Sequence, residues 1–286
     1  MNSPIYLDYA TCTPTDPAVA ELMHQHLCMG GTFANPASRG HVYGWQADEA
    51  VEAARVDLAQ TLNADPREIV WTSGATESDN LALKGLMARG QRLGRKHIIT
   101  SEIEHKAVLD TCAWMQVQGF EVTYLKPNPE GIITLDQVAA TLRGDTLLVS
   151  LMQVNNELGS INDLTGIAAL CREHGVLSHT DAAQSFGKIA VDVQVMGVDM
   201  LSLSGHKIYG PKGIGALYVR RQEGLALEAQ IHGGGHEMGM RSGTLPTHQI
   251  VGLAAAAKLM QAELDSESER IATLRDRFVG HLQQMP

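Results

Sequence analysis

Lys207 occupies a position where a lysine side chain can take part in covalent chemistry. It ends the tetrapeptide Ser204-Gly205-His206-Lys207, which follows the mostly apolar run 198–203. A short run of this kind predicts a buried strand, with the tetrapeptide as a turn at its carboxyl end. The lysine amine at such a turn can form a Schiff base with a carbonyl compound, and the neighbouring hydroxyl and imidazole can bind a phosphate.

A second candidate for phosphate binding is the segment Ser73–Ser78, which follows a predicted strand and begins a predicted helix. Its small residues allow the backbone to approach an anion closely, and the N–H groups of a helix N-terminus attract negative charge. The alternative is ordinary helix capping by Thr76 or Ser73. The segment alone leaves both interpretations open.

Three more polar side chains each follow their own predicted strand. Asp181 can pair with a protonated pyridine nitrogen, or it can cap the next helix. His105 can stack on a ring and move protons, or it can be a solvent-facing loop residue. Asn156 can hydrogen-bond a cofactor oxygen, or it can stabilise a turn. Each is weak evidence alone, but their order together with the phosphate turn and the lysine points to pyridoxal 5′-phosphate (PLP).

No metal site or disulfide framework is predicted. His232 and His236 flank three glycines, but no third ligand is evident and a flexible triglycine is a poor platform for coordination. The adjoining segment Met240–Thr244 is a better candidate for binding an anion. The cysteines form no CxxC pair, which favours a reducing, cytoplasmic setting. The four cysteines are Cys12, Cys28, Cys112 and Cys171.

The composition is that of an ordinary globular protein, with 286 residues, 44% of them hydrophobic and 19% charged. A chain of this length can bury a sizeable core. The net charge of −10 argues against nucleic acid or an anionic membrane as a partner. No apolar run reaches the roughly 18 residues of a membrane helix, and the first eight residues do not resemble a secretory signal.

Short apolar strands alternate with amphipathic helices, which predicts an α/β fold with a mainly parallel sheet. Ligands of such sheets collect at the carboxyl ends of the strands, where the residues above fall. The predicted strands are Ile69–Thr72, His97–Thr100, Val122–Leu125, Leu147–Leu151, Val176–Thr180, Met200–Ser204 and Gly215–Val219. The predicted helices are Gln46–Thr61, Glu77–Arg89, Lys106–Gln118, Leu135–Leu142, Ile161–His174 and Gln249–Gln284.

These segments resemble cysteine desulfurases, the class V aminotransferase-like branch of fold-type I PLP enzymes, and most closely the bacterial type that feeds iron–sulfur cluster assembly. The resemblance runs along nearly the whole chain and is most specific at 204–213 and 241–244. The segments that carry it are Pro4–Tyr9, Asn35–Ser38, Thr72–Asn80, Glu104–Leu109, Val154–Glu157, Ser204–Gly213 and Gly233–Pro246.

The resemblance implies a fold-type I large domain, a mainly parallel seven-stranded sheet with helices on both faces. Residues 1–20 would form an N-terminal segment, residues 21–248 the PLP-binding large domain, and residues 249–286 a connecting helix. The C-terminal small domain is expected to be largely absent.

The resemblance also implies roles for the site residues. Lys207 would hold PLP as a Schiff base and later move protons, and His105 would stack on the ring and assist proton transfer. Asp181 would keep the pyridine nitrogen protonated, and Asn156 and Gln184 would hydrogen-bond near the ring hydroxyl. The phosphate would be bound by Ala75, Thr76, Ser204 and His206, joined by Thr244 from a partner subunit. The protein is therefore expected to be a homodimer.

The reaction implied is conversion of L-cysteine to alanine, with the sulfur held as a persulfide on an enzyme cysteine. The sulfur would then pass to an iron–sulfur scaffold or another sulfur-acceptor protein. The family's persulfide cysteine and its carboxylate-binding arginine would lie beyond Pro286, so the chain as it stands is expected to be inactive. The alternatives are another PLP lyase, such as a selenocysteine lyase, or a non-catalytic remnant that acts as a dimerising scaffold.

Two positions depart from the family pattern. Cys12 stands in a segment near the expected site, where threonine is usual, and Ala183 replaces the usual threonine after Asp181-Ala182. The other three cysteines lie in helix-like stretches and are expected to be packing residues.

Overall fold

The seven predicted strands are all present in the computed structural model, which describes residues 4–285. Residues 1–3 of the predicted N-terminal segment and Pro286 of the predicted connecting helix lie outside the described residues. The strands are β1 (Ile69–Thr72), β2 (His97–Ser101), β3 (Glu121–Leu125), β4 (Thr146–Ser150), β5 (Leu177–Asp181), β6 (Met200–Ser204) and β7 (Gly215–Val219). Their bounds differ from the predicted ones by one residue at most.

The strands form one mainly parallel sheet in the order β1-β7-β6-β5-β4-β2-β3. Strands β3, β2, β4, β5 and β6 are parallel to one another, whereas β7 is antiparallel to both β6 and β1. Residues 205–214, which connect β6 to β7, are too few for a parallel crossover, because such a crossover needs about a dozen residues or more. Strand β7 therefore runs antiparallel to β6. The lysine turn therefore leads directly into a neighbouring strand.

The helices match the predicted ones, with ends that differ by up to four residues, except in three places. The predicted helix Glu77–Arg89 is two helices, because α3 ends at a capping glycine, Gly85. Two helices that the sequence analysis did not predict, α1 and α8, are short, although α1 begins with an aspartate cap and a proline. The helices are α1 (Pro17–His24), α2 (Val42–Leu62), α3 (Ala75–Lys84), α4 (Met87–Leu93), α5 (Lys106–Val117), α6 (Leu135–Thr141), α7 (Leu164–Glu173), α8 (Val193–Met196) and α9 (Thr247–Leu282).

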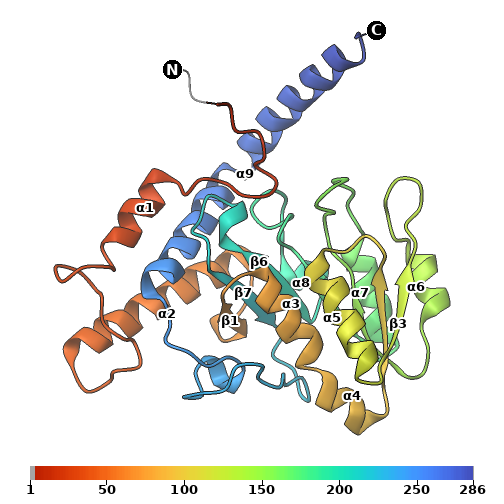
Figure 1. The fold of residues 1–286 in the computed structure, drawn as a ribbon, viewed down its shortest axis with the longest axis horizontal. Helices are drawn as coiled ribbons and strands as arrows, with labels where there is room; N and C mark the ends of the chain where they lie inside the picture. Colours follow the sequence, from red (N-terminus) through yellow and green to blue (C-terminus); the bar gives the residue numbers. More distant parts are fainter. Residues whose placement is uncertain (1–3, 286) are drawn as a thin grey trace.

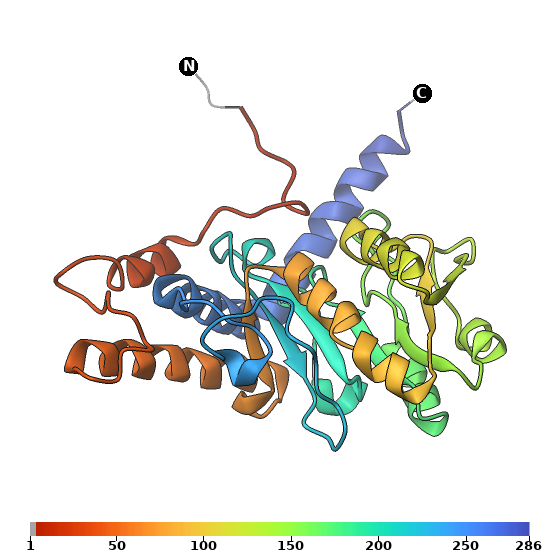
Figure 2. The same cartoon turned by 60° about the horizontal axis from the view of Figure 1, so that its bottom comes forward.

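Helices cover both faces of the sheet, as Figures 1 and 2 show. Neighbouring residues of one strand point into different cores: Leu148 packs with α3 and α5, and Val149 packs with α6 and α7. A third hydrophobic cluster contains side chains of β1, β6 and β7, which pack against α2 and the first half of α9. Layers of this kind are typical of α/β proteins.

Helix α9 has two different halves. Its first half is buried through Ile250, Leu253 and Ala257 among others, and it packs beside α1 and α2. Its second half projects away from the body of the molecule (Figures 1 and 2). No helix of residues 4–285 is both long and apolar enough to cross a membrane.

Candidate active site

A cavity of about 1130 Å³ opens where the carboxyl ends of the parallel strands meet. Turns that follow β1, β2, β5 and β6 contribute to its wall. Nine of the ten predicted site residues line it: Ala75, Thr76, His105, Asn156, Asp181, Gln184, Ser204, His206 and Lys207. The tenth, Thr244, is exposed and does not line this cavity.

One end of the cavity offers donors suited to a phosphate. The N-cap of α3 is Gly74, which makes no side-chain cap bond, so the alternative in which Thr76 or Ser73 caps the helix is wrong. The first N–H groups of α3 therefore lack a side-chain partner. Nearby, the buried Oγ of Ser204 and Nδ1 of His206 also have no hydrogen-bond partner within the described residues. Buried polar atoms are normally paired, so these atoms fit an anionic ligand group.

Asp181 lies at the end of β5 and is 6% exposed. Its Oδ1 accepts a hydrogen bond from the backbone N–H of Ala183 at 2.8 Å. No helix follows β5 directly, so the alternative role of helix cap is wrong. Burial raises the pKa of Asp181, whereas the nearby Lys207 and His105 lower it. A buried carboxylate of this kind favours a cationic partner such as a protonated ring nitrogen.

His105 is the N-cap of α5 and also part of the cavity wall. Its Nδ1 accepts a hydrogen bond from the Ala107 N–H at 3.1 Å. This bond assigns the ring proton of the neutral imidazole to Nε2, which is left able to donate. The residue is half-buried rather than a solvent-facing loop histidine.

Gln184 is held at both ends of its amide group. Its Oε1 accepts a hydrogen bond from Lys188 Nζ at 2.7 Å, and its Nε2 donates to the Ala10 carbonyl at 2.9 Å. Burial, assisted by the charge of Lys207, lowers the pKa of Lys188 to about 8. Sequence reasoning did not identify Lys188, although a lysine four residues after Gln184 was available as a signal.

Two roles were considered for this turn, turn stabilisation and ligand binding, and they fit different residues, Asn155 and Asn156. The Asn155 Oδ1 accepts hydrogen bonds from the N–H groups of Glu157 and Leu158 at 2.9 and 2.8 Å, so Asn155 stabilises the turn. Asn156 lines the cavity, and its Nδ2 donates to Glu157 at 2.9 Å. The turn thus holds Asn156 at the site.

Hydrogen bonds from the N-terminal segment hold the turn that contains Lys207. Both the N–H and the hydroxyl of Thr13 donate to the His206 carbonyl, at 2.8 and 3.0 Å. The Thr13 hydroxyl oxygen in turn accepts from the Tyr209 N–H at 2.7 Å. These bonds fix the backbone on either side of Lys207, and they bring Cys12 to the cavity wall.

Comparison with known proteins identifies the family. The class V aminotransferase family matches residues 5–286. Cysteine desulfurase IscS of Shewanella baltica (strain OS223) is 60% identical over 287 residues, which cover 99% of this chain and 71% of the relative. That of Shewanella oneidensis is 59% identical with the same coverage. This chain belongs to the cysteine desulfurases.

Solved structures agree with this family. A NifS-like protein superposes with a TM-score of 0.94 at 36% identity, covering 98% of this chain and 76% of its own. DndA from Streptomyces lividans gives a TM-score of 0.88 at 45% identity, covering 98% and 79%. A structure described as SspA in complex with cysteine gives 0.85 at 49% identity, covering 89% and 72%. The fold and the family therefore rest on both sequence and structure.

Residues 233–243, the glycine-rich segment after β7, are anchored by two ion pairs. Sequence reasoning did not find either pair. Glu237 accepts hydrogen bonds from Arg55 at 2.9 and 2.8 Å and from the backbone N–H of Trp71 at 2.8 Å. Arg241 pairs with Glu77 of α3 at 2.8 Å. Within residues 4–285 no group of three metal-ligating side chains lies together. His236 instead accepts a hydrogen bond from the Gly243 N–H at 3.2 Å.

The cysteines differ in their surroundings. Cys112 and Cys171 are buried packing residues, and burial raises the pKa of both thiols to about 12. The expectation that Cys28 packs in a helix is wrong, because α1 ends at His24 and Cys28 is exposed in the turn beyond it. Of the four, Cys12 alone lines the cavity.

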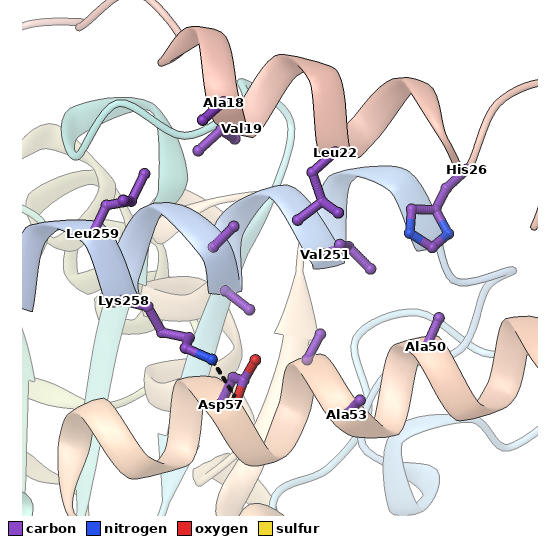
Figure 3. A pocket seen from close by; sticks show the side chains of 13 residues that line it. Ala18, Val19, Leu22, His26, Ala50, Ala53, Asp57, Val251, Lys258 and Leu259 are labelled. Atoms are coloured by element: carbon purple, nitrogen blue, oxygen red, sulfur yellow. Dashed lines mark ion pairs between the residues drawn. The ribbon is translucent and has the colours of Figure 1, made fainter.

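A second cavity, of about 510 Å³, lies between α1, α2 and α9 (Figure 3). Its wall is mainly alanine, valine and leucine, and it contains the ion pair of Lys258 with Asp57 at 3.1 Å. None of the predicted site residues lines it. The predicted site residues therefore gather at the cavity at the strand ends and not at this one.

Proposed function

We propose that this chain binds PLP through Lys207 and acts on L-cysteine as a PLP-dependent cysteine desulfurase. The observation that carries the proposal is the meeting of four groups at one cavity. These are a lysine, two buried polar atoms without partners, an aspartate that favours a cation, and a histidine with a free Nε2–H. Together they match the aldehyde, phosphate and pyridine nitrogen of PLP.

Each residue is assigned one task in this proposal. The Lys207 amine binds the PLP aldehyde and, when released, carries a proton. The N–H groups at the start of α3, with Ser204 and His206, hold the phosphate. Asp181 holds the ring nitrogen in its protonated form, and Asn156 and Gln184 orient the ring through its hydroxyl. When bound, PLP supplies an electron sink for bond changes at the amino-acid substrate.

L-Cysteine is proposed as the substrate because the relatives are named for its desulfuration and one similar structure holds cysteine. His105, which lines the cavity and whose ring proton is assigned to Nε2, is proposed to exchange a proton with a bound group. The final sulfur acceptor is expected to be an iron–sulfur scaffold or a similar protein.

A homodimer is part of the proposal. Thr244 is exposed and lies outside its own cavity, so its hydroxyl is free to reach the phosphate site of a partner subunit. The division into residues 1–20, 21–248 and 249–286 belongs to the same proposal. A cytoplasmic setting fits the free state of all four cysteines.

The experiment is a PLP titration of the Lys207→Ala variant followed by visible absorbance. Loss of the bound chromophore in this variant, with retention in Lys212→Ala, supports the proposal. Lys212 is a matched control because it is another lysine of the same cavity wall. Equal spectra for wild type and Lys207→Ala would instead favour a non-catalytic scaffold.

A further inference from the structure

Asp79 is a buried carboxyl group next to the candidate active site. None of the roles proposed above for the site residues involves it. It lies on α3 and is 0% exposed, and it does not line the cavity. Neither of its carboxyl oxygens has a hydrogen-bond partner within the described residues. An ionised carboxylate in such a position lacks the donors that would compensate for lost hydration.

The nearest basic group to Asp79 cannot supply a positive charge. His179 Nε2 lies 3.6 Å from Asp79 Oδ1, and both side chains are fully buried. The His179 ring is already paired with two hydroxyls, those of Ser150 at 2.8 Å and Ser202 at 3.0 Å. Burial lowers the pKa of His179 to about 3, so its ring is neutral at ordinary pH.

The other charged groups around Asp79 are two buried carboxyls and one lysine: Asp181, Glu104 and Lys207. Burial, with added repulsion from Asp181, raises the pKa of Asp79. The Ser202 hydroxyl lies near enough to lower this pKa, but its hydrogen bond is made with His179 and not with Asp79, so it and the charge of Lys207 offset the rise only in part. Glu104 accepts hydrogen bonds from the Met152 N–H at 2.9 and 3.1 Å, while Asp181 accepts one from Ala183. Asp79 is thus the least compensated of the three.

We propose that Asp79 remains a neutral carboxylic acid at neutral pH and leaves Asp181 as the carboxylate that faces the ring nitrogen. This inference rests on the proposed function for the role of Asp181, but the protonation of Asp79 itself belongs to the protein without cofactor. Two interacting carboxyls in one buried region do not both ionise readily, and the better hydrogen-bonded one keeps the charge.

Infrared spectroscopy of the cofactor-free protein at neutral pH tests the protonation directly. The spectrum of wild type minus that of Asp79→Asn is expected to contain the C=O band of a carboxylic acid. Any acid band from Glu104 is common to both proteins and cancels. Carboxylate bands in the difference spectrum would overturn the inference. If Asp79→Asn does not fold, ¹³C-aspartate labelling of the wild-type protein replaces it, because a shifted acid band is then expected from a buried aspartate and its absence overturns the inference.

The pH dependence of unfolding gives an independent check. A carboxyl whose pKa is higher in the folded than in the unfolded state binds more protons when folded, so stability falls as the pH rises above about 4. Asp79→Asn removes this loss. The variant is expected to gain stability over wild type as the pH rises from about 4 to neutrality, whereas a constant difference at every pH contradicts the inference.

With PLP present, the same substitution at the two aspartates is expected to have opposite effects. Asp79→Asn replaces a neutral acid by a neutral amide, so it retains the PLP affinity. Asp181→Asn removes a buried charge from its partner and is expected to weaken PLP binding roughly a hundredfold. Equal losses in the two variants would mean that Asp79 also carries charge. Failure of the proposed function would abolish PLP binding in wild type and leave both cofactor-free tests valid.

Discussion

Buried polar side chains determine what the cavity can bind. Ser204 Oγ and His206 Nδ1 have no partner in the described residues, while Gln184 and His105 are each fixed by hydrogen bonds to neighbouring groups. The cavity therefore combines groups with free hydrogen-bonding capacity and groups with set orientation. This pre-organisation is what a site needs in order to hold a ligand in one geometry.

Lys188 gives a prediction at the scale of a single residue. Its pKa is lowered to about 8 in the folded protein, so the folded state binds fewer protons than the unfolded state above that pH. Wild type is expected to gain about 1–2 kcal/mol of stability between pH 8 and about 10, a figure reduced because the side chain is only partly buried. Lys188→Met should not show this gain. Urea unfolding across this pH range measures it, and parallel curves for both proteins would contradict it.

Sequence reasoning predicted the cavity-lining residues that follow strands, because strand ends are visible in one sequence. It could not identify Asp79, Arg55 or Glu237. Their environments depend on residues far away in the chain: Arg55 meets Glu237 across 182 positions. Such pairs leave no local pattern, and only the folded chain brings them together.

At the scale of elements, the buried ion pair of Arg55 and Glu237 fixes the glycine-rich segment to α2 and β1. The side chains of the pair are 8% and 2% exposed. Arg55→Met leaves Glu237 as an unpaired buried charge and is expected to destabilise the protein by about 3–5 kcal/mol. Chemical denaturation measures the loss.

The matched control is Arg270→Met, which breaks the pair with Glu267 on an exposed part of α9. That change is expected to cost less than about 1 kcal/mol. Similar losses for the two variants would show that the Arg55 pair does not anchor the segment.

Strand positions were predictable because the strands are short, mostly rich in apolar or β-branched residues, and bounded by polar turns. The antiparallel direction of β7 and the division of one predicted helix into α3 and α4 were not. Both depend on short connections, residues 205–214 and the capping glycine Gly85, whose effect appears only when the neighbouring elements pack.

At the scale of the whole molecule, the outer half of α9 presents an exposed apolar stripe. Its members are spaced three or four residues apart and are more than 45% exposed: Ile271, Leu274, Phe278 and Leu282. Residues at this spacing share one face of a helix. An exposed stripe of this kind promotes association.

The 286-residue chain is therefore expected to self-associate in sedimentation experiments. Substitution of both Leu274 and Phe278 by glutamate should weaken the association, whereas Thr273→Glu, off the stripe, should not. A monodisperse monomer of the wild-type chain would contradict the prediction.

Covalent binding of PLP at Lys207 is the central claim of the proposed function. The most direct measurement is intact mass and peptide mapping after borohydride reduction of the PLP-treated chain. We predict a mass increase of one reduced PLP over the unmodified chain, located on the peptide that contains Lys207. No adduct, or an adduct on Lys106 or Lys212 of the same cavity wall, would contradict the account.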